Sequence, residues 1–286
     1  MTNNNQVHHA KAFCWPQWFN TSVADDSKII LPPQQIQQIN QANLNIWDAL
    51  NIFDDFLDQS GHAKDLPLAI TKYRDFVTFF YELNLDKSFY TIFNNTLSDL
   101  DRANQHETQK YRLNVINGKI YLPNKLPDPE PLIKLSRKSL ALALGPIAVL
   151  YLLYDKNAAD KVGQVLKFFQ FSLAAKQLAD DSKDWYDDLQ TGQLTMANRP
   201  IIEAALNSKF ELDLKDSSGE LHYLFAKHIS LVITEQLISL CNQARKAAVK
   251  CGLAPNCILI KEIIGPIETS VLEVKNFRSW LEADLK

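Results

Sequence analysis

Apolar residues recur at helical spacing along most of this chain of 286 residues. Phe89, Ile92 and Phe93, for example, share one helix face, because residues three and four positions apart point to the same side. The pattern predicts helices over residues 34–58, 68–80, 88–109, 132–154, 158–189, 200–206, 221–250 and 257–281. We therefore expect an all-α fold: a single-domain helical bundle over residues 1–286, with an irregular N-terminal segment at 1–33.

Residues 113–122 depart from the helical pattern. Asn117-Gly118 separates two short apolar runs there, and Asn-Gly is the preferred pair for a two-residue hairpin turn, so we expect one small β-hairpin. Prolines at 123, 127, 129 and 131 then predict an extended connector. We place the connector inside one domain, because each half of the chain contains one of the two acidic motifs described below, and we expect neither motif to function without the other. Residues 210–221 predict a loop with weak strand character.

Composition and charge exclude several classes of protein. Glycine accounts for only 8 of 286 residues, and neither GxGxxG nor GxxxxGK[ST] occurs, which argues against a glycine-rich nucleotide-binding loop. Average glycine usage is about 7%. The formal charge is −3 and no Lys/Arg stripe is visible, so we expect no nucleic-acid partner.

The cysteines and the apolar runs bear on the cellular location. The four cysteines form no CxxC pair, which argues against a thiolate zinc site and fits a reduced, cytoplasmic setting. The N-terminus lacks the features of a secretory signal. The apolar run at 140–154 is shorter than the ~20 residues of a spanning helix, and Gly145-Pro146 interrupts it. We expect a kinked core helix and no transmembrane segment, with peripheral membrane contact left open.

The first acidic motif, DDxxD, covers residues 54–58. At 100° per residue, its three aspartates share a helix face with Asp48 and Asn51, opposite apolar side chains from Ile46 to Leu57. A solvated helix face is the simplest interpretation of this motif alone. However, no Lys or Arg stands at i+3 or i+4, and like-charge repulsion costs a few tenths of a kcal/mol per pair. The repulsion is either tolerated or relieved by a cation from outside.

The second acidic motif lies in residues 177–188. Asp180, Asp184 and Asp188 stand at i, i+4 and i+8 and line one stripe, with Asp187 alongside and Lys183 as the nearby cation. The opposite face contains the apolar residues Phe171, Ala175, Leu178, Trp185 and Leu189. Each motif alone fits a surface patch, but two such helices favour a metal site.

Magnesium chemistry explains this interpretation. Mg²⁺ prefers oxygen ligands and usually takes one or two carboxylates, with waters and substrate phosphates completing its octahedron. Two facing acidic helices would hold several Mg²⁺ ions that bridge to a diphosphate and neutralise its charge as it leaves. No nucleophilic side chain is then needed.

The two motifs resemble those of the class I isoprenoid synthase superfamily, which includes trans-prenyltransferases, squalene/phytoene synthases and terpene synthases. Their separation, 180 − 54 = 126 residues, is compatible with that family. Residues 177–192, QLADDSKDWYDDLQTG, are similar to the squalene/phytoene synthase pattern QLxNxxRDxxEDxxxG, with Asp180 replacing Asn and Lys183 replacing Arg. The resemblance implies an isoprenoid-synthase-type bundle, several Mg²⁺ ions and a possible homodimer. The metal ligands it implies are Asp54, Asp55, Asp58, Asp180, Asp184 and Asp188, of which Asp54, Asp58, Asp184 and Asp188 are also expected to be catalytic.

Two other branches of the superfamily remain open. A DDxxD preceded by Gln177 is similar to the second motif of chain-elongating prenyl diphosphate synthases, but residues 59–64 lack the Arg-Arg those enzymes place there. Asp180, Asp184 and Asp188 also approximate a terpene cyclase pattern, with Asp replacing its Ser and Glu. The resemblance implies an enzyme that ionises an all-trans prenyl diphosphate, most like head-to-head prenyl transfer, with cyclisation or elongation as alternatives. A non-catalytic helical protein that uses its acidic faces to bind a basic partner is the alternative from another class.

Four polar side chains are candidates for binding the diphosphate. Arg137 and Lys138 precede the apolar run, Lys183 lies inside the second motif, and Gln177 matches the pattern above. Solvated charge is the simpler explanation for each of the three cations. Phe168, Phe169, Phe171 and Tyr151 either line a prenyl cavity or form ordinary core.

Overall fold

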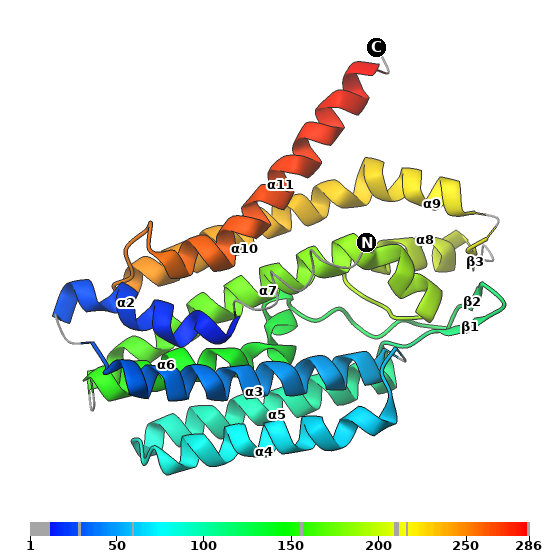
Figure 1. Ribbon diagram of the computed structural model, residues 1–286. Coiled ribbons are helices and arrows are strands. Elements are labelled where there is room, and N and C mark those ends of the chain that lie inside the picture. The colour runs from blue at the N-terminus through cyan, green and yellow to red at the C-terminus, as the bar shows by residue number, and fades with distance from the viewer. Residues whose placement is uncertain are drawn as a thin grey trace. The chain divides into compact units, whose positions relative to one another are not determined.

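The computed structural model of the protein describes residues 12–27, 30–58, 60–154, 157–208, 212–215 and 217–284, and it confirms the all-α prediction (Figure 1). The described residues form the α-helices α2 (Trp15–Ser27), α3 (Pro33–Leu57), α4 (Leu66–Glu82), α5 (Lys87–Lys110), α6 (Leu144–Tyr154), α7 (Ala158–Thr191), α8 (Arg199–Ser208), α9 (Ser218–Leu224), α10 (Ser230–Lys250) and α11 (Ile258–Asp284). Shorter helical segments are the 3₁₀ helices η1 (Ala12–Cys14), η2 (Ala63–Asp65), η3 (Leu132–Lys138) and η4 (Leu140–Ala143), and the π-helical turn η6 (Phe225–Ile229).

The chain divides into two compact units. The first unit comprises Met1–Asp101, Arg137–Gln170 and Ala244–Ile263, and the second comprises Arg102–Ser136, Phe171–Gln243 and Ile264–Lys286. The first acidic motif belongs to the first unit and the second acidic motif to the second unit. The single-domain organisation stays a prediction.

Aromatic packing builds the core of the first unit. Helix α4 packs against α3, and its Phe76 and Phe80 contact Phe93 and Phe89 of α5 at ring-centroid distances of 5.7 and 5.9 Å. All four rings are fully buried. Figure 1 shows α3, α4 and α5 running alongside one another. This packing holds the helix that ends in the first acidic motif.

The N-terminal segment is more ordered than predicted. Residues 15–27 form α2, so the expectation of an irregular segment throughout 1–33 is wrong. Trp15 and Phe19, four positions apart, are buried, and Trp15 stacks on Phe169 at 5.6 Å. Pro16 stands in the first turn of α2, where its missing N–H removes no helical hydrogen bond.

The apolar run at 140–154 is a buried core helix, as predicted, but its bend lies elsewhere. A 78° bend separates η3 from residues 140–154, whereas Gly145-Pro146 lies in the first turn of α6. Proline is tolerated in a first turn, because the N–H it lacks would have no partner there. Gly145 is needed for close packing: an added Cβ would lie 2.3 Å from Oδ1 of the buried Asn43.

The predicted hairpin is present in the second unit. Strands β1 (Asn114–Ile116) and β2 (Lys119–Tyr121) pair antiparallel, and the two turn residues have positive φ angles of 56° and 85°. Such angles are characteristic of the turn that Asn-Gly favours. Strand β3 (Leu212–Asp213) pairs with β2, which confirms the strand character expected after residue 210, although the chain is already helical from Ser218.

Among the described residues, one continuous helical run, Ser218–Lys250, is long and apolar enough to cross a membrane. One third of its most apolar window is buried. Core helices of soluble proteins pass the same test, so this run assigns no membrane role by itself.

Candidate functional site

The first acidic motif occupies the end of α3. Asp54 and Asp55 lie in the last helical turn and are exposed, while Asp58 is the half-buried C-cap, whose N–H donates to the Asp54 carbonyl at 2.8 Å. Helix C-termini carry partial negative charge, so three carboxylates here are electrostatically unfavourable unless a cation is near. The last turn of α3 contains no basic residue.

Lysines from other elements of the first unit supply that cation. Lys138 of η3 places its Nζ 2.9 Å from Oδ1 of Asp54, and Lys72 of α4 lies 3.2 Å from Oδ2 of Asp48. Lys72 also donates to Oδ1 of Asn45 at 3.1 Å. The pattern at i+3 and i+4 could not reveal these lysines, because both are distant in sequence. Of the three cations expected near the diphosphate, Lys138 therefore lies at the first motif, and Arg137 precedes it on η3.

A tight turn fixes the end of α3. The N–H groups of Ser60 and Gly61 both donate to the Asp55 carbonyl, at 2.9 and 2.7 Å. A Cβ on Gly61 would lie 2.8 Å from the Phe56 nitrogen, so only glycine fits without a shift. Phe56, expected on the apolar face, is 41% exposed, because it lies in this final turn.

The second acidic motif lies within α7, with its opposite face buried as predicted. Ala175, Leu178, Trp185 and Leu189 are buried, and Trp185 stacks on Phe225 with ring centroids 4.4 Å apart. Phe171 is half-buried. On the other face, Asp180, Asp184 and Asp187 are exposed and Asp188 is half-buried. Packing therefore orients the carboxylates outward.

Partial burial has the largest influence on the ionisation of Asp184. Partial burial raises the pKa of this carboxyl above its usual value; neighbouring Lys183 lowers the pKa, and Asp180 and Asp187 raise it further. Lys176, which the sequence pattern did not single out, pairs with Asp180 at 2.6 Å. Two lysines, Lys183 and Lys176, therefore offset part of the carboxylate charge around Asp184.

Gln177 has a role different from the one expected. Its Nε2 donates to Oδ1 of Asp181 at 2.8 Å, and Asp181 is buried. An amide that satisfies a buried carboxylate stabilises α7 itself. Its assignment to diphosphate binding stays a prediction that nothing in this geometry supports.

The end of α7 is held by its connections to neighbouring segments. Gly192, which matches the glycine of the family pattern, has a φ of +79°, and its added Cβ would lie 2.3 Å from the Leu113 carbonyl oxygen. The side chain of buried Asn198 accepts from the Thr195 N–H at 2.9 Å and donates to the Gln193 carbonyl at 2.8 Å. It also donates to the Trp185 carbonyl at 3.4 Å, beside Asp184.

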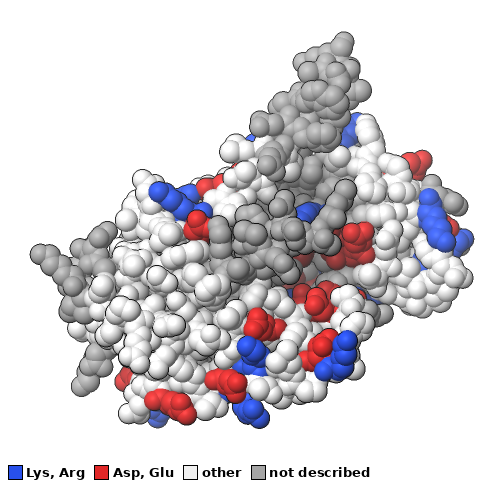
Figure 2. All heavy atoms as spheres, in the orientation of Figure 1, with Lys and Arg blue, Asp and Glu red and all other residues white. Residues whose placement is uncertain are grey.

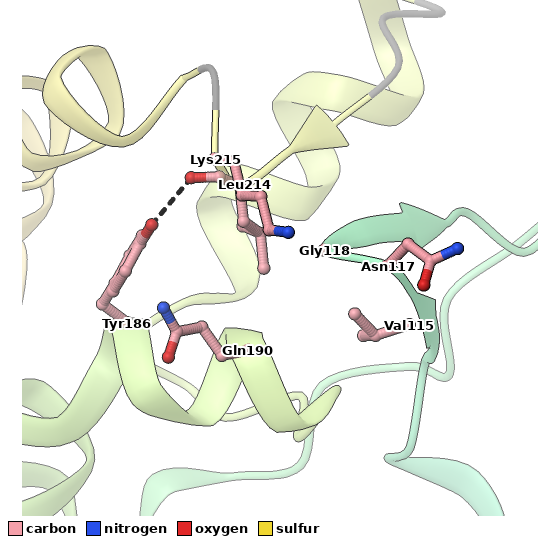
Figure 3. Close-up of a pocket in the computed structure, with 7 residues that line it drawn as sticks. All are labelled: Val115, Asn117, Gly118, Tyr186, Gln190, Leu214 and Lys215. Atoms are coloured by element: carbon pink, nitrogen blue, oxygen red, sulfur yellow. Dashed lines mark hydrogen bonds between the residues drawn. The ribbon is translucent and has the colours of Figure 1, made fainter.

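A cavity of about 360 Å³ in the second unit was not predicted (Figure 3). Its lining residues are Val115, Asn117, Gly118, Tyr186, Gln190, Leu214 and Lys215. The Tyr186 hydroxyl donates to the Leu214 carbonyl at 2.7 Å across one side of the cavity. At 100° per residue, Tyr186 and Gln190 lie about 120–160° around α7 from Asp184 and Asp188. The acidic stripe therefore faces away from this cavity.

The donor chemistry of both motifs fits Mg²⁺. Among the described residues, no three His, Cys, Asp or Glu side chains converge as a ready-made metal site. Mg²⁺ commonly needs only one or two carboxylates, with waters and phosphates completing its shell. Acidic and basic side chains of the described residues are interspersed on the face drawn in Figure 2.

The aromatic candidates for a prenyl cavity are mostly core. Phe168 and Phe169 are fully buried, Tyr151 is 4% exposed, and its hydroxyl hydrogen-bonds Ser88 at 2.8 Å.

No protein-family model and no curated protein matches this chain. The resemblance to isoprenoid synthases therefore stays a prediction that depends on the two motifs.

Proposed function

We propose that this protein is a Mg²⁺-dependent isoprenoid synthase that ionises an all-trans prenyl diphosphate and joins the allylic cation to an alkene. One observation carries the proposal: two helices of an all-α chain each expose aspartates of a DDxxD-type motif. On α7 these aspartates stand opposite buried Trp185 and Leu189, so they cannot turn inward. A divalent cation there would offset the negative charge that Asp180 and Asp187 place around Asp184.

Each motif contributes carboxylates to metal binding. Asp54 and Asp58, helped by Asp55, serve the first motif, and Asp184 and Asp188, helped by Asp180, serve the second. Bound Mg²⁺ would supply Lewis-acid stabilisation of the departing diphosphate. Lys138 and Arg137 at the first motif, and Lys183 at the second, supply further positive charge to the phosphate oxygens.

The capturing alkene determines the product class. Similarity of residues 177–192 to squalene/phytoene synthases favours an alkene from a second prenyl diphosphate, which gives head-to-head coupling. Capture within the same molecule would make the protein a terpene cyclase. Capture by isopentenyl diphosphate would make it a chain-elongating synthase.

A non-catalytic acidic protein is the second candidate, and the ion pairs favour it. Lys138–Asp54, Lys72–Asp48 and Lys176–Asp180 neutralise part of both acidic faces without any metal. Exposed acidic helices of this kind could bind a basic partner.

Product analysis tests the proposal. The protein is incubated with Mg²⁺ and farnesyl or geranylgeranyl diphosphate, with and without isopentenyl diphosphate, and products are identified by mass spectrometry. We expect a doubled carbon skeleton, lost on chelation and in Asp54→Asn and Asp184→Asn. Asp75→Asn, an exposed α4 aspartate outside both motifs, is the matched control and should remain active. No product from any substrate would favour the non-catalytic alternative.

A further inference from the structure

Lys138 stands out because it neutralises the motif that is expected to bind metal. Its Nζ lies 2.9 Å from Oδ1 of Asp54, the first aspartate of the DDxxD motif. The Lys138 side chain is only 21% exposed, whereas that of Asp54 is 52% exposed. The carboxylate can therefore still be reached from solvent, while most of the lysine side chain is covered by protein.

The position of the pair at a helix end increases its importance. Asp54, Asp55 and Asp58 gather at the negative end of α3, and the last turn contributes no cation of its own. A Mg²⁺ ion that binds Asp54 would compete with the ammonium for the same carboxylate and repel it at short range. A phosphate that arrives with the metal would offer the displaced ammonium another anion.

We propose that Lys138 is an internal counter-ion that Mg²⁺ must displace from Asp54, so that the first motif takes up metal together with a phosphate that accepts the released ammonium. This inference rests on the proposed function and adds a coupling between metal and diphosphate binding. In the metal-free protein the ion pair protects the motif from binding Mg²⁺ alone. In the complex the same lysine contributes to diphosphate binding.

Lys72 provides a matched control inside the first unit. It also pairs with an aspartate of α3, at 3.2 Å, and its side chain has a similar exposure of 27%. Its partner, Asp48, lies outside the DDxxD motif, and Asn45 shares the ammonium at 3.1 Å. Removing Lys72 therefore removes a comparable ion pair without freeing a proposed metal ligand.

Calorimetry with Mg²⁺ and inorganic diphosphate tests the coupling. Mg²⁺ is titrated into full-length wild type, Lys138→Gln and Lys72→Gln, each with and without diphosphate. The same titration of Asp54→Asn shows which part of the binding heat comes from the first motif. We expect Lys138→Gln to bind Mg²⁺ alone at least threefold more tightly. The enhancement of Mg²⁺ binding by diphosphate should fall at least tenfold, and Lys72→Gln should change neither quantity.

Lys138→Arg should keep the counter-ion role that Lys138→Gln removes. It also tests the inference if the glutamine variant does not fold. Arginine keeps the charge and can pair with a carboxylate through two N–H groups, so Mg²⁺ alone should bind no more tightly than in wild type. Enhancement by diphosphate should persist in Lys138→Arg.

Two results would overturn the inference. If wild type binds Mg²⁺ and diphosphate together and Asp54→Asn abolishes this, but Lys138→Gln matches wild type, the counter-ion role is wrong and the proposed function stands. If wild type shows no Mg²⁺-dependent diphosphate binding, both fail.

Discussion

The two acidic motifs have similar sequences but different electrostatic surroundings. The first lies at the end of α3, where Lys138 reaches Asp54 from another element. The second lies within α7, where partial burial raises the pKa of Asp184, Lys183 lowers it, and Asp180 and Asp187 raise it. An added cation must compete with Lys138 at Asp54 and with Lys176 at Asp180, but at Asp184 it would stabilise a carboxylate whose charge burial disfavours. We therefore expect Mg²⁺ alone to bind more tightly at the second motif.

The backbone supports of the two motifs differ as well. Gly61 closes the turn at the helix end that carries the first motif, where its N–H and that of Ser60 donate to the Asp55 carbonyl. Gly192 closes α7 against the chain that enters the hairpin, and the Leu113 N–H donates to the Gly192 carbonyl at 2.7 Å. The second motif thus belongs to a more extensively connected segment.

The largest expected change in unfolding free energy comes from substituting one of these two glycines. Gly192→Ala combines a strained positive φ with a clash against backbone, so we expect a loss of about 3 kcal/mol or more in unfolding free energy. Gly61→Ala should cost about 1–2 kcal/mol. Urea denaturation measures both. Gly163→Ala on α7, where an added Cβ meets nothing within 4 Å, should instead stabilise by about 0.5–1 kcal/mol. Equal losses at the two turns would contradict the difference in support.

A smaller difference is expected between two buried asparagines. Asn198 makes hydrogen bonds with three backbone groups around the end of α7. Asn43 of α3 donates to the Leu142 carbonyl at 2.9 Å, and its Oδ1 finds no hydrogen-bond partner among the described residues. Asn198→Ala should cost about 2–3 kcal/mol and Asn43→Ala about 1–2 kcal/mol. Urea denaturation measures both losses of unfolding free energy. A larger loss for Asn43→Ala than for Asn198→Ala would contradict the prediction.

Single charge changes should alter stability in opposite directions at the two motifs. Lys138→Gln leaves Asp54 uncompensated at a helix C-terminus, so the metal-free protein should lose about 0.5–1 kcal/mol. Asp184→Asn removes a charge that is disfavoured by partial burial and, despite the attraction of Lys183, by Asp180 and Asp187, so this variant should gain about a few tenths of a kcal/mol. Losses in both variants would show that crowding at Asp184 carries no cost.

The smallest effect is a pH dependence specific to Asp184. Its pKa is raised in the folded protein, so the folded state holds the proton more strongly and this group favours folding at low pH. That contribution is complete below the unfolded pKa, about 3.9, and is lost as pH rises through the folded value. The stability advantage of Asp184→Asn should therefore be present at pH 7 and vanish below pH ~4. An advantage that does not change with pH would point to packing instead.

Local patterns predicted most of the fold but not the partners of the acidic residues. The hairpin follows from Asn117-Gly118 because that pair has an intrinsic turn preference, and α3 and α7 match the predicted ranges to within a few residues. Helix α2 was missed because its start at Trp15-Pro16 lacks a polar N-cap and its support is burial against distant residues. Lys138 was named only as a diphosphate ligand, since its contact with Asp54 arises from tertiary packing. The buried hydrogen bonds of Asn198 likewise join segments that no short window contains.

Mg²⁺-dependent diphosphate binding tests the central claim most directly. Inorganic diphosphate is titrated into wild type, Asp54→Asn and Asp184→Asn by calorimetry, in Mg²⁺ and in chelator, with Asp75→Asn as the control. We predict that wild type and Asp75→Asn bind diphosphate only with Mg²⁺, and that each motif variant weakens this binding at least tenfold. Binding that is absent from wild type, or that survives loss of either aspartate, would contradict a metal-dependent diphosphate site.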